Sequence, residues 1–355
     1  MNTQLLKKRF EETPRMEPQD AVKLAFQSAF GCGHLLPCET LCTERIRREM
    51  DETPVSDAPV YTPIGNGLCR LNLSNAQVQT LRPEWIDAMM RLTDQQVRAQ
   101  TDLQARFHQA VSLISALAHN GEAPFSSEGF KDYLSGYDGS VVRHTDGYRE
   151  HYHPAYRVVL ENCALLTHVL AGIQQGSSLI VFDGPCGSGK TTLAGLLGKL
   201  LGTVPVPMDD FFLPPDMRTP ERLAQPGGNV HRERFLEEVL HSLLSGGDVR
   251  WRRFDCGTFE MHDRCLPKTD VTVIEGSYSH HPAFREAYEK LGALRVFVEV
   301  DAQEQLRRIG KRDPELLSMF QSRWIPLEKN YFEAYDIRGG ADLVIQSPAQ
   351  GEGRA

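Results

Sequence analysis

The chain has 355 residues, of which 41% are hydrophobic and 24% charged. These values are typical of a globular protein with room for two or three domains. The net charge of -8 disfavours a general grip on nucleic acid, and no apolar run approaches the about 20 residues that a membrane span needs. Eight cysteines without regular spacing, and a charged N-terminus without the apolar core of a signal peptide, predict reduced thiols and a cytoplasmic protein.

The first half of the chain has mostly helical patterns. Besides a short strand at Leu68–Leu73, we expect helices at Asp20–Phe30 and Glu39–Met50, two in Pro83–His119 with a break near Thr93 or Asp102, and one at Pro154–Ile173. The polar stretch Gln174–Ser178 predicts a domain boundary. Residues 1–175 are therefore expected to form a mainly α-helical domain, to which we attach no activity.

From Ser178 onward, apolar runs of strand length alternate with helical patterns. This alternation predicts a parallel sheet flanked by helices, an α/β fold of P-loop type over residues 176–350. The expected strands are Leu179–Phe182, Thr203–Met208, Val271–Glu275, Leu294–Val300 and Asp342–Ile345. The expected helices follow the first strand and occupy Arg232–Leu244, Ala283–Leu291 and Ala302–Lys311.

A glycine-rich loop follows the first of these strands and fits G-x-x-x-x-G-K-S/T at every fixed position. Its backbone N–H groups and the next helix N-terminus would hold phosphates, Lys190 would reach the β- and γ-phosphates, and Thr191 would ligate Mg²⁺. The alternative is a chance glycine-rich turn, but strand, loop and helix occur in the required order. The expected nucleotide-binding residues are Gly184, Pro185, Cys186, Gly187, Ser188, Gly189, Lys190, Thr191 and Thr192.

Acidic residues end the next two predicted strands. Asp209 and Asp210 follow the second strand, and Glu275 ends the third. At the carboxyl edge of a parallel sheet such acids can face a γ-phosphate, accept a proton from a hydroxyl or assist Mg²⁺. The alternatives are a turn cap for the aspartates and a solvated strand end for Glu275.

A basic segment follows the fourth predicted strand. It contains Arg307, Arg308, Lys311 and Arg312. Such a segment could close over the phosphates and stabilise charge in the transition state. The alternative is the solvated face of an amphipathic helix.

Taken in order, these motifs resemble those of the uridine kinase/phosphoribulokinase group of P-loop small-molecule kinases. The resemblance covers about the last half of the chain and rests on Gly184–Thr192, Asp209–Phe212, Phe254-Asp255, Val273–Gly276, Leu306–Asp313 and Ala341–Ile345. It implies ATP and Mg²⁺ as cofactors, Asp209 as the base and a Mg²⁺ contact, Glu275 as a second Mg²⁺ contact, and Arg308 and Arg312 as lid residues. We also expect five candidate substrate residues near the acceptor: Asp210, Phe211, Asp255, Arg232 and Tyr278.

Two departures from this group concern the substrate. The stretch Gly227–Phe235 lacks the acid that grips ribose hydroxyls in uridine kinases, and His262 is displaced from the position that reads uracil. Arg232, Arg234, Arg252 and Arg253 suggest a more anionic acceptor, although each alone reads more simply as a surface arginine.

The first half resembles, faintly, a helical segment of bacterial uridine kinase-like proteins. Cys32, His34, Cys38 and Cys42 lie close enough in sequence to raise a zinc hypothesis, but their spacing is not that of standard zinc knuckles. Isolated histidines such as His151 and His153 more often cap or pack than bind ligands.

The sequence therefore favours an ATP- and Mg²⁺-dependent kinase that phosphorylates a hydroxyl of a small metabolite. The alternatives are a nucleotide-gated regulator and a bifunctional enzyme whose helical half acts on the same metabolite. The expected partner is the acceptor, not nucleic acid or membrane, and a homodimer is left open.

Overall fold

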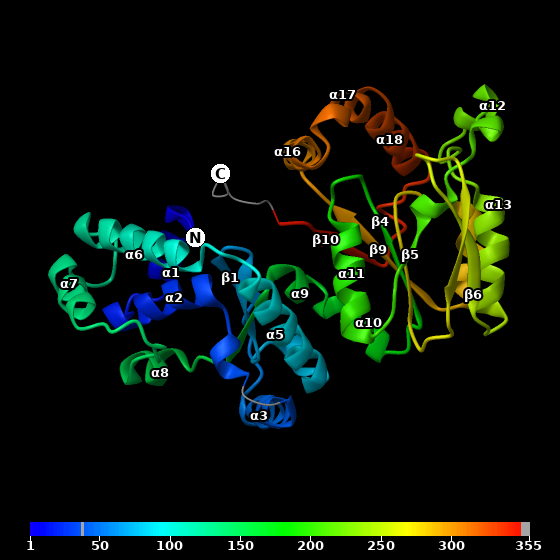
Figure 1. Cartoon of the computed structure of the whole chain (residues 1–355). Coiled ribbons are helices and arrows are strands. Elements are labelled where there is room, and N and C mark those ends of the chain that lie inside the picture. Colours follow the sequence, from blue (N-terminus) through cyan, green and yellow to red (C-terminus); the bar gives the residue numbers. More distant parts are fainter. Residues whose placement is uncertain (37–38, 349–355) are drawn as a thin grey trace. The chain divides into compact units, whose positions relative to one another are not determined.

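The computed structural model describes residues 1–36 and 39–348 and divides the chain into two compact units. The first unit is Met1–Thr167, and the second runs from His168 to the end of the described chain. Figure 1 shows helices and a small sheet in the first unit, and a larger sheet with helices in the second. In the described residues, no helix combines the length and apolar character needed to cross a bilayer.

The first unit packs helices around a three-stranded antiparallel sheet of order β1-β2-β3. Its strands are β1 (Tyr61–Gly65), β2 (Leu68–Asn72) and β3 (Tyr156–Leu160), and the expected strand near Leu68 is confirmed. Its helices are α1 (Thr3–Glu12), α2 (Pro18–Phe30), α3 (Glu39–Glu52), α4 (Ala76–Gln79), α5 (Pro83–Arg98), α6 (Leu103–His119), α7 (Ser127–Ser135), α8 (Asp146–Tyr152) and α9 (Glu161–Leu165).

The expected single helix at Pro154–Ile173 is wrong. Its first part forms β3, which pairs with β2 from Leu68↔Leu160 to Asn72↔Tyr156, and its remainder is divided between α9 and α10 (Thr167–Gln174). A short apolar run fits a buried strand and a buried helix equally well. Here the run contains the β-branched pair Val158-Val159, and β2 offers it a partner edge.

The second unit is built on a five-stranded parallel sheet of order β10-β9-β4-β8-β5. The strands are β4 (Leu179–Asp183), β5 (Val206–Pro207), β8 (Thr272–Glu275), β9 (Ala293–Glu299) and β10 (Leu343–Gln346). All five predicted strands are present, but the second is shorter than expected. Pro205 and Pro207 lack the N–H that a longer ladder needs, and Met208–Phe211 turns into a 3-10 helix.

Helices flank this sheet, as predicted. They are α10, α11 (Lys190–Leu201), α12 (Pro220–Leu223), α13 (Arg232–Phe235), α14 (His241–Leu244), α15 (Arg285–Lys290), α16 (Ala302–Arg312), α17 (Leu317–Met319) and α18 (Ile325–Ala334). The single helix expected at Arg232–Leu244 is interrupted by a π-helical segment, Leu236–Leu240, between α13 and α14.

An antiparallel hairpin of β6 (Val249–Phe254) and β7 (Met261–Leu266) was not expected. Its strands carry many charged residues, and most of β7 is exposed, so they lack the apolar pattern that marked the other strands. Trp251 anchors the hairpin, because its indole N–H donates to Asp210 Oδ2 at 2.7 Å.

The core of the second unit contains a chain of three aromatic rings. Phe235 lies between Phe211 and Phe284, with ring centroids 5.0 and 4.8 Å away, and all three side chains are fully buried. These contacts tie the turn after β5 to α13 and to the start of α15. They fix the backbone that carries the acids at the end of β5.

We expect Phe235→Ala to lower the free energy of unfolding of this unit by about 3–5 kcal/mol, because it leaves a cavity between two buried rings. Val204→Ala is the control: Val204 is 67% exposed, so its loss is expected to cost less than about 0.5 kcal/mol. Urea unfolding followed by tryptophan fluorescence in a Trp85→Phe background reports on Trp251 and Trp324, which both lie in this unit. Equal costs for the two variants would contradict this account of the core.

Candidate nucleotide site

The loop between β4 and α11 has a backbone that requires glycine at three positions. Gly184, Gly187 and Gly189 have φ values of +144°, +75° and +94°. At Gly184 an added Cβ would lie 2.3 Å from the carbonyl oxygen of Val298 on β9. The chain therefore passes so close to the neighbouring strand that no side chain fits, and the turn that would cradle phosphate is fixed by the sheet.

Asp183, directly before the loop, is a fully buried anchor rather than a reactive group. Its Oδ1 accepts from the N–H groups of Gly184 at 2.6 Å and Tyr278 at 3.2 Å. Its Oδ2 accepts from the N–H of His280 at 2.8 Å and from the Tyr331 hydroxyl at 2.9 Å. Four donors thus join the start of the loop, the segment after β8 and α18 at one carboxylate.

Lys190 and Thr191, at the start of α11, lie where the sequence places phosphate and metal contacts. The ammonium of Lys190 is largely buried and donates to the carbonyl of Pro185 at 3.3 Å. The Thr191 hydroxyl donates to Glu275 Oε2, at the end of β8, at 2.9 Å. Burial raises the pKa of the Glu275 carboxyl, and the nearby Asp209 carboxylate adds to that rise, while Lys190 opposes it.

The adjacent residues Asp209 and Asp210 face different surroundings. Asp209 is exposed and close enough to Glu275 to influence its pKa. Asp210 is buried, bonded to Trp251 and 3.7 Å from the Arg253 guanidinium, and burial raises its pKa. Pro207 on β5 pairs with Glu275 on β8, so Asp209, two residues further on, follows the strand end beside the Thr191–Glu275 pair, whereas Asp210 holds the β6–β7 hairpin.

The other residues expected near the acceptor are engaged within the protein. Phe211 lies in the aromatic core, and the buried Tyr278 packs against Tyr331 with the ring centroids 4.9 Å apart and the rings tilted by 57°. Asp255 accepts from the N–H groups of residues 257 and 258 in the hairpin turn, and Arg232 donates to Gln225 and Glu233. In the described chain, no hydrogen bond, ion pair or ring contact joins any of these four side chains to Lys190, Thr191 or Glu275.

Of the two expected lid arginines, the structure brings one to the loop. The Arg308 guanidinium donates to the carbonyls of Gly187 at 3.1 Å and Ser188 at 3.2 Å, and its Nε donates to Glu304 at 2.7 Å. Arg312, one turn later on α16, pairs with Asp313 and is 59% exposed. Arg308 thus supports the carbonyl side of the loop, and Arg312 projects into solvent.

Sequence analysis missed three residues at the loop: Glu328, Ser277 and Gln305. Glu328 on α18 is buried and accepts from the Cys186 N–H at 2.9 Å and from the Ser277 hydroxyl at 2.7 Å. Gln305 on α16 donates to the Cys186 carbonyl at 2.9 Å. The signal for Glu328 was its spacing from Tyr331, which places an acid on the buried face of a helix. Its partner could not be inferred, because the loop is about 140 residues away in sequence.

The zinc hypothesis gains no support from the described residues. They contain no group of three or more His, Cys, Asp or Glu side chains arranged to hold a metal ion. Cys32 donates to the Met90 carbonyl, and burial raises the pKa of its thiol to about 12 and that of Cys42 to about 11. Cys38 lies outside the described residues.

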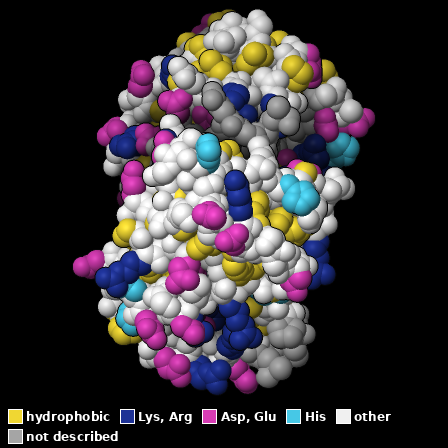
Figure 2. Space-filling model, turned by 90° about the vertical axis from the view of Figure 1, so that its left-hand side faces the viewer, with side chains coloured by type: hydrophobic (Ala, Val, Ile, Leu, Met, Phe, Trp, Pro, Cys, Tyr) yellow, Lys and Arg dark blue, Asp and Glu magenta, His cyan; other side chains and the backbone are white. Residues whose placement is uncertain are grey.

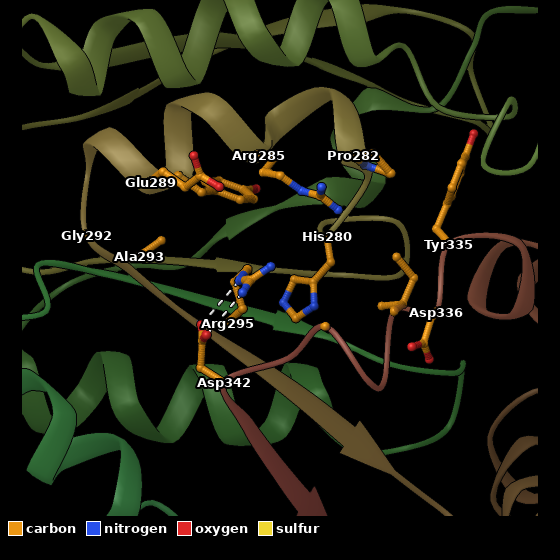
Figure 3. A pocket seen from close by; sticks show the side chains of 13 residues that line it. His280, Pro282, Arg285, Glu289, Gly292, Ala293, Arg295, Tyr335, Asp336 and Asp342 are labelled. Atoms are coloured by element: carbon orange, nitrogen blue, oxygen red, sulfur yellow. Dashed lines mark hydrogen bonds and ion pairs between the residues drawn. The ribbon is translucent and has the colours of Figure 1, made fainter.

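A polar cavity of ≈ 290 Å³ lies elsewhere in the second unit. In Figure 3 the Arg295–Asp342 ion pair and His280 lie on one side of it, and Arg285 and Glu289 on the side of α15. No residue of the phosphate loop lines this cavity. The face of the molecule in Figure 2 carries interspersed basic and acidic side chains and no large patch of one sign.

The parallel sheet and the glycine loop define the second unit as an α/β unit of P-loop type. No family model matches the chain, and no curated protein matches it. Two solved structures are similar in fold. A possible uridine kinase from Bacillus stearothermophilus has 20% identity and a TM-score of 0.36, over 48% of this chain and 89% of its own. A candidate fructose transport system kinase from Silicibacter sp. TM1040 has 23% identity and a TM-score of 0.38, over 49% and 95%.

We expect Gly184→Ala to destabilise the second unit by about 1–3 kcal/mol, because alanine is strained at this φ and its Cβ would meet the Val298 carbonyl. Gly195→Ala is the matched control. Gly195 lies in α11, where an added Cβ meets nothing within 4 Å, so alanine should leave stability unchanged or raise it by up to about 1 kcal/mol. Thermal unfolding of both variants checks the pair, and a Gly184 variant as stable as the parent would disprove the close approach.

Proposed function

We propose that the second unit is an ATP- and Mg²⁺-dependent phosphotransferase that acts on a hydroxyl group of a small metabolite. The observation that carries the proposal is the convergence of Lys190, Thr191, Glu275 and Asp209 at the carboxyl edge of the sheet, beside the glycine loop. Phosphoryl transfer needs this set: a cationic phosphate contact, oxygen ligands for a metal, and a carboxylate that can receive a proton.

The loop fits a triphosphate. The Lys190 ammonium is largely buried, and its recorded hydrogen bond is a long one to a neutral carbonyl, so an anion would be a better partner. The buried Ser188 hydroxyl, in the middle of the loop, makes no hydrogen bond within residues 1–36 and 39–348. The N-terminus of α11 adds its positive end to the same place.

The acids fit Mg²⁺. Hard oxygen ligands suit this ion, and Thr191, Glu275 and Asp209 supply a hydroxyl and two carboxylates. Burial and the nearby Asp209 charge raise the pKa of Glu275, so a cation would relieve both effects. When bound, Mg²⁺ would neutralise phosphate charge.

The proposed chemistry uses the chain's own groups as follows. Lys190 and the loop amides would hold the β- and γ-phosphates, and the exposed Asp209 would receive the proton of the acceptor hydroxyl. The new O–P bond would form as the bond from the γ-phosphorus to the β,γ-bridging oxygen breaks, and ADP would leave with that oxygen. Arg308 would hold the loop through its carbonyls, and Arg312 would have to leave Asp313 and the Phe320 ring to approach the phosphates when the site closes.

A nucleotide-gated regulator is the second candidate. The observation that favours it is the double contact of the loop with helices further along the chain: Glu328 of α18 on its amide side and Arg308 of α16 on its carbonyl side. A change in the loop on nucleotide binding would pass directly to both helices. ATP consumption that does not depend on any acceptor, or no consumption, would favour this reading over the kinase.

We expect Lys190→Ala to abolish turnover, and Asp209→Asn to lower kcat at least a hundredfold because the proton acceptor is lost; ATP should still bind, since Lys190, the loop amides, Thr191 and Glu275 are unchanged. ADP release in the presence of nucleosides, glycerate and sugar acids measures turnover, and calorimetry measures ATP affinity. Asp216→Asn, in the Pro215–Met217 turn, is the control and should retain activity. Near-normal turnover by the Asp209 variant would exclude it as the base.

We expect Mg²⁺-dependent ATP affinity to fall as the pH is lowered, beginning above the ordinary glutamate pKa of 4.5, because Glu275 has a raised pKa and binds a cation only when deprotonated. Glu275→Gln should bind Mg²⁺·ATP more weakly at neutral pH and should lose this part of the pH dependence. Affinities measured with and without Mg²⁺ from pH 5 to 8 check it. The same pH profile in parent and variant would assign the titration to another group.

A further inference from the structure

The first unit contains a buried polar cluster that the nucleotide site does not use. Its members come from elements far apart in sequence: Asp20 and Gln27 lie on α2, Arg70 on β2, Tyr156 on β3, and His144 just before α8. Asp20, Gln27 and Arg70 are at most 4% exposed. Ionisable side chains are seldom buried to this degree unless their charges are paired.

Asp20 carries the negative charge of this cluster, and both of its carboxylate oxygens already accept hydrogen bonds. Asp20 Oδ1 accepts from His144 Nδ1 at 2.8 Å and from the Thr145 N–H at 3.0 Å, and its Oδ2 accepts from the Thr145 hydroxyl and the Glu17 N–H. His144 Nε2 then accepts the Tyr156 hydroxyl proton at 2.7 Å. Burial lowers the pKa of His144 to about 4, so the imidazole is neutral. Its Nδ1 therefore donates to Asp20 and its Nε2 accepts from Tyr156.

The positive charge of Arg70 has no carboxylate partner in the described chain. Its Nε and Nη2 both donate to the neutral Gln27 Oε1, at 3.1 and 2.8 Å. Its guanidinium lies 4.4 Å from the centre of the Tyr156 ring. The third nitrogen, Nη1, has no hydrogen-bond acceptor among the described residues, although it is not sealed from solvent. An oxyanion that reaches this nitrogen from solvent would give the guanidinium the charged acceptor that it lacks among the described residues.

Two more cations lie close to Arg70. Lys23 on α2 donates to the Val142 carbonyl at 3.1 Å, and burial, with the nearby Arg70 charge, lowers its pKa to about 8. Arg9 on α1 pairs with Glu12, but its Nε is buried without a partner, and burial and the Arg70 charge lower its pKa too. Cations that lower one another's pKa store an unfavourable free energy, which a bound anion would offset.

We propose that the first unit binds a small molecule carrying an oxyanion, a carboxylate or a phosphate group, through Arg70, Lys23 and Arg9 beside the Tyr156 ring. Arginine forks suit both groups, and the two share this chemistry. All of these residues belong to the first unit, and the proposal does not rest on the kinase proposal. A purely structural network would account for the Asp20–His144–Tyr156 chain, but it leaves the positive charge of Arg70 without a carboxylate partner among the described residues.

The test titrates full-length protein carrying Lys190→Ala, which removes the lysine of the phosphate loop, with inorganic phosphate and with citrate in separate calorimetric experiments. We expect saturable binding of at least one of them. Phosphate alone would indicate a phosphorylated ligand, and citrate alone a carboxylate. In the same background, Lys23→Met should weaken binding at least tenfold, and Lys131→Met, at an exposed position on α7, less than twofold.

A second readout distinguishes a ligand contact from a structural role and also covers the case in which Lys23→Met does not fold. Between pH 8 and 9.5 the affinity of the Lys190→Ala protein should fall more than fivefold as Lys23 loses its proton. Lys23→Arg, added to that protein, keeps the charge, so its affinity should change less than twofold. The charged groups that act on Lys23 are Arg70, Asp20, Arg143 and Arg149. The proposal would be overturned if neither anion binds saturably. It would also be overturned if the affinity depends on pH in the same way in the Lys190→Ala protein and in the Lys190→Ala, Lys23→Arg protein.

Discussion

The second unit depends on one buried carboxylate. Asp183 collects hydrogen bonds from the first residue of the phosphate loop, from two N–H groups after β8 and from the Tyr331 hydroxyl on α18. Hydrogen bonds to a charged group are stronger than neutral ones, and a buried charge left without them would be costly. The loop therefore cannot shift without disturbing β8 and α18, the two elements that also supply Glu275 and Glu328.

Around this anchor, some side chains are bonded to other parts of the protein, whereas others could still bind a ligand. Asp210, Tyr278 and Arg308 are bound to protein partners and position the hairpin, the segment after β8 and the loop. Asp209 is exposed, and Lys190 has only a weak neutral partner. This division explains how adjacent residues of the same type, Asp209 and Asp210, come to have different roles: only one is withdrawn from water.

The sequence was sufficient for features encoded locally. The phosphate loop needs glycines at positions set by backbone conformation, and each parallel strand is a short apolar run, so Gly184 and β4 could be placed in advance. Features that depend on distant contacts were missed: β3 looks helical until β2 is beside it, and Glu328 meets Cys186 only in the folded unit. Likewise, the pairing of Asp20 with His144 spans 124 residues.

The contacts of Glu328 and Arg308 have a mechanical consequence. One side of the phosphate loop is held by α18 and the other by α16, and the chain between these helices, residues 313–324, carries several exposed side chains. Any hinge motion of that segment would pull on the two sides of the loop at once. A displacement of that segment would therefore change the hydrogen bonds of Cys186 with Glu328 and of Gly187 with Arg308 together, and with them the shape that the loop offers to an anion.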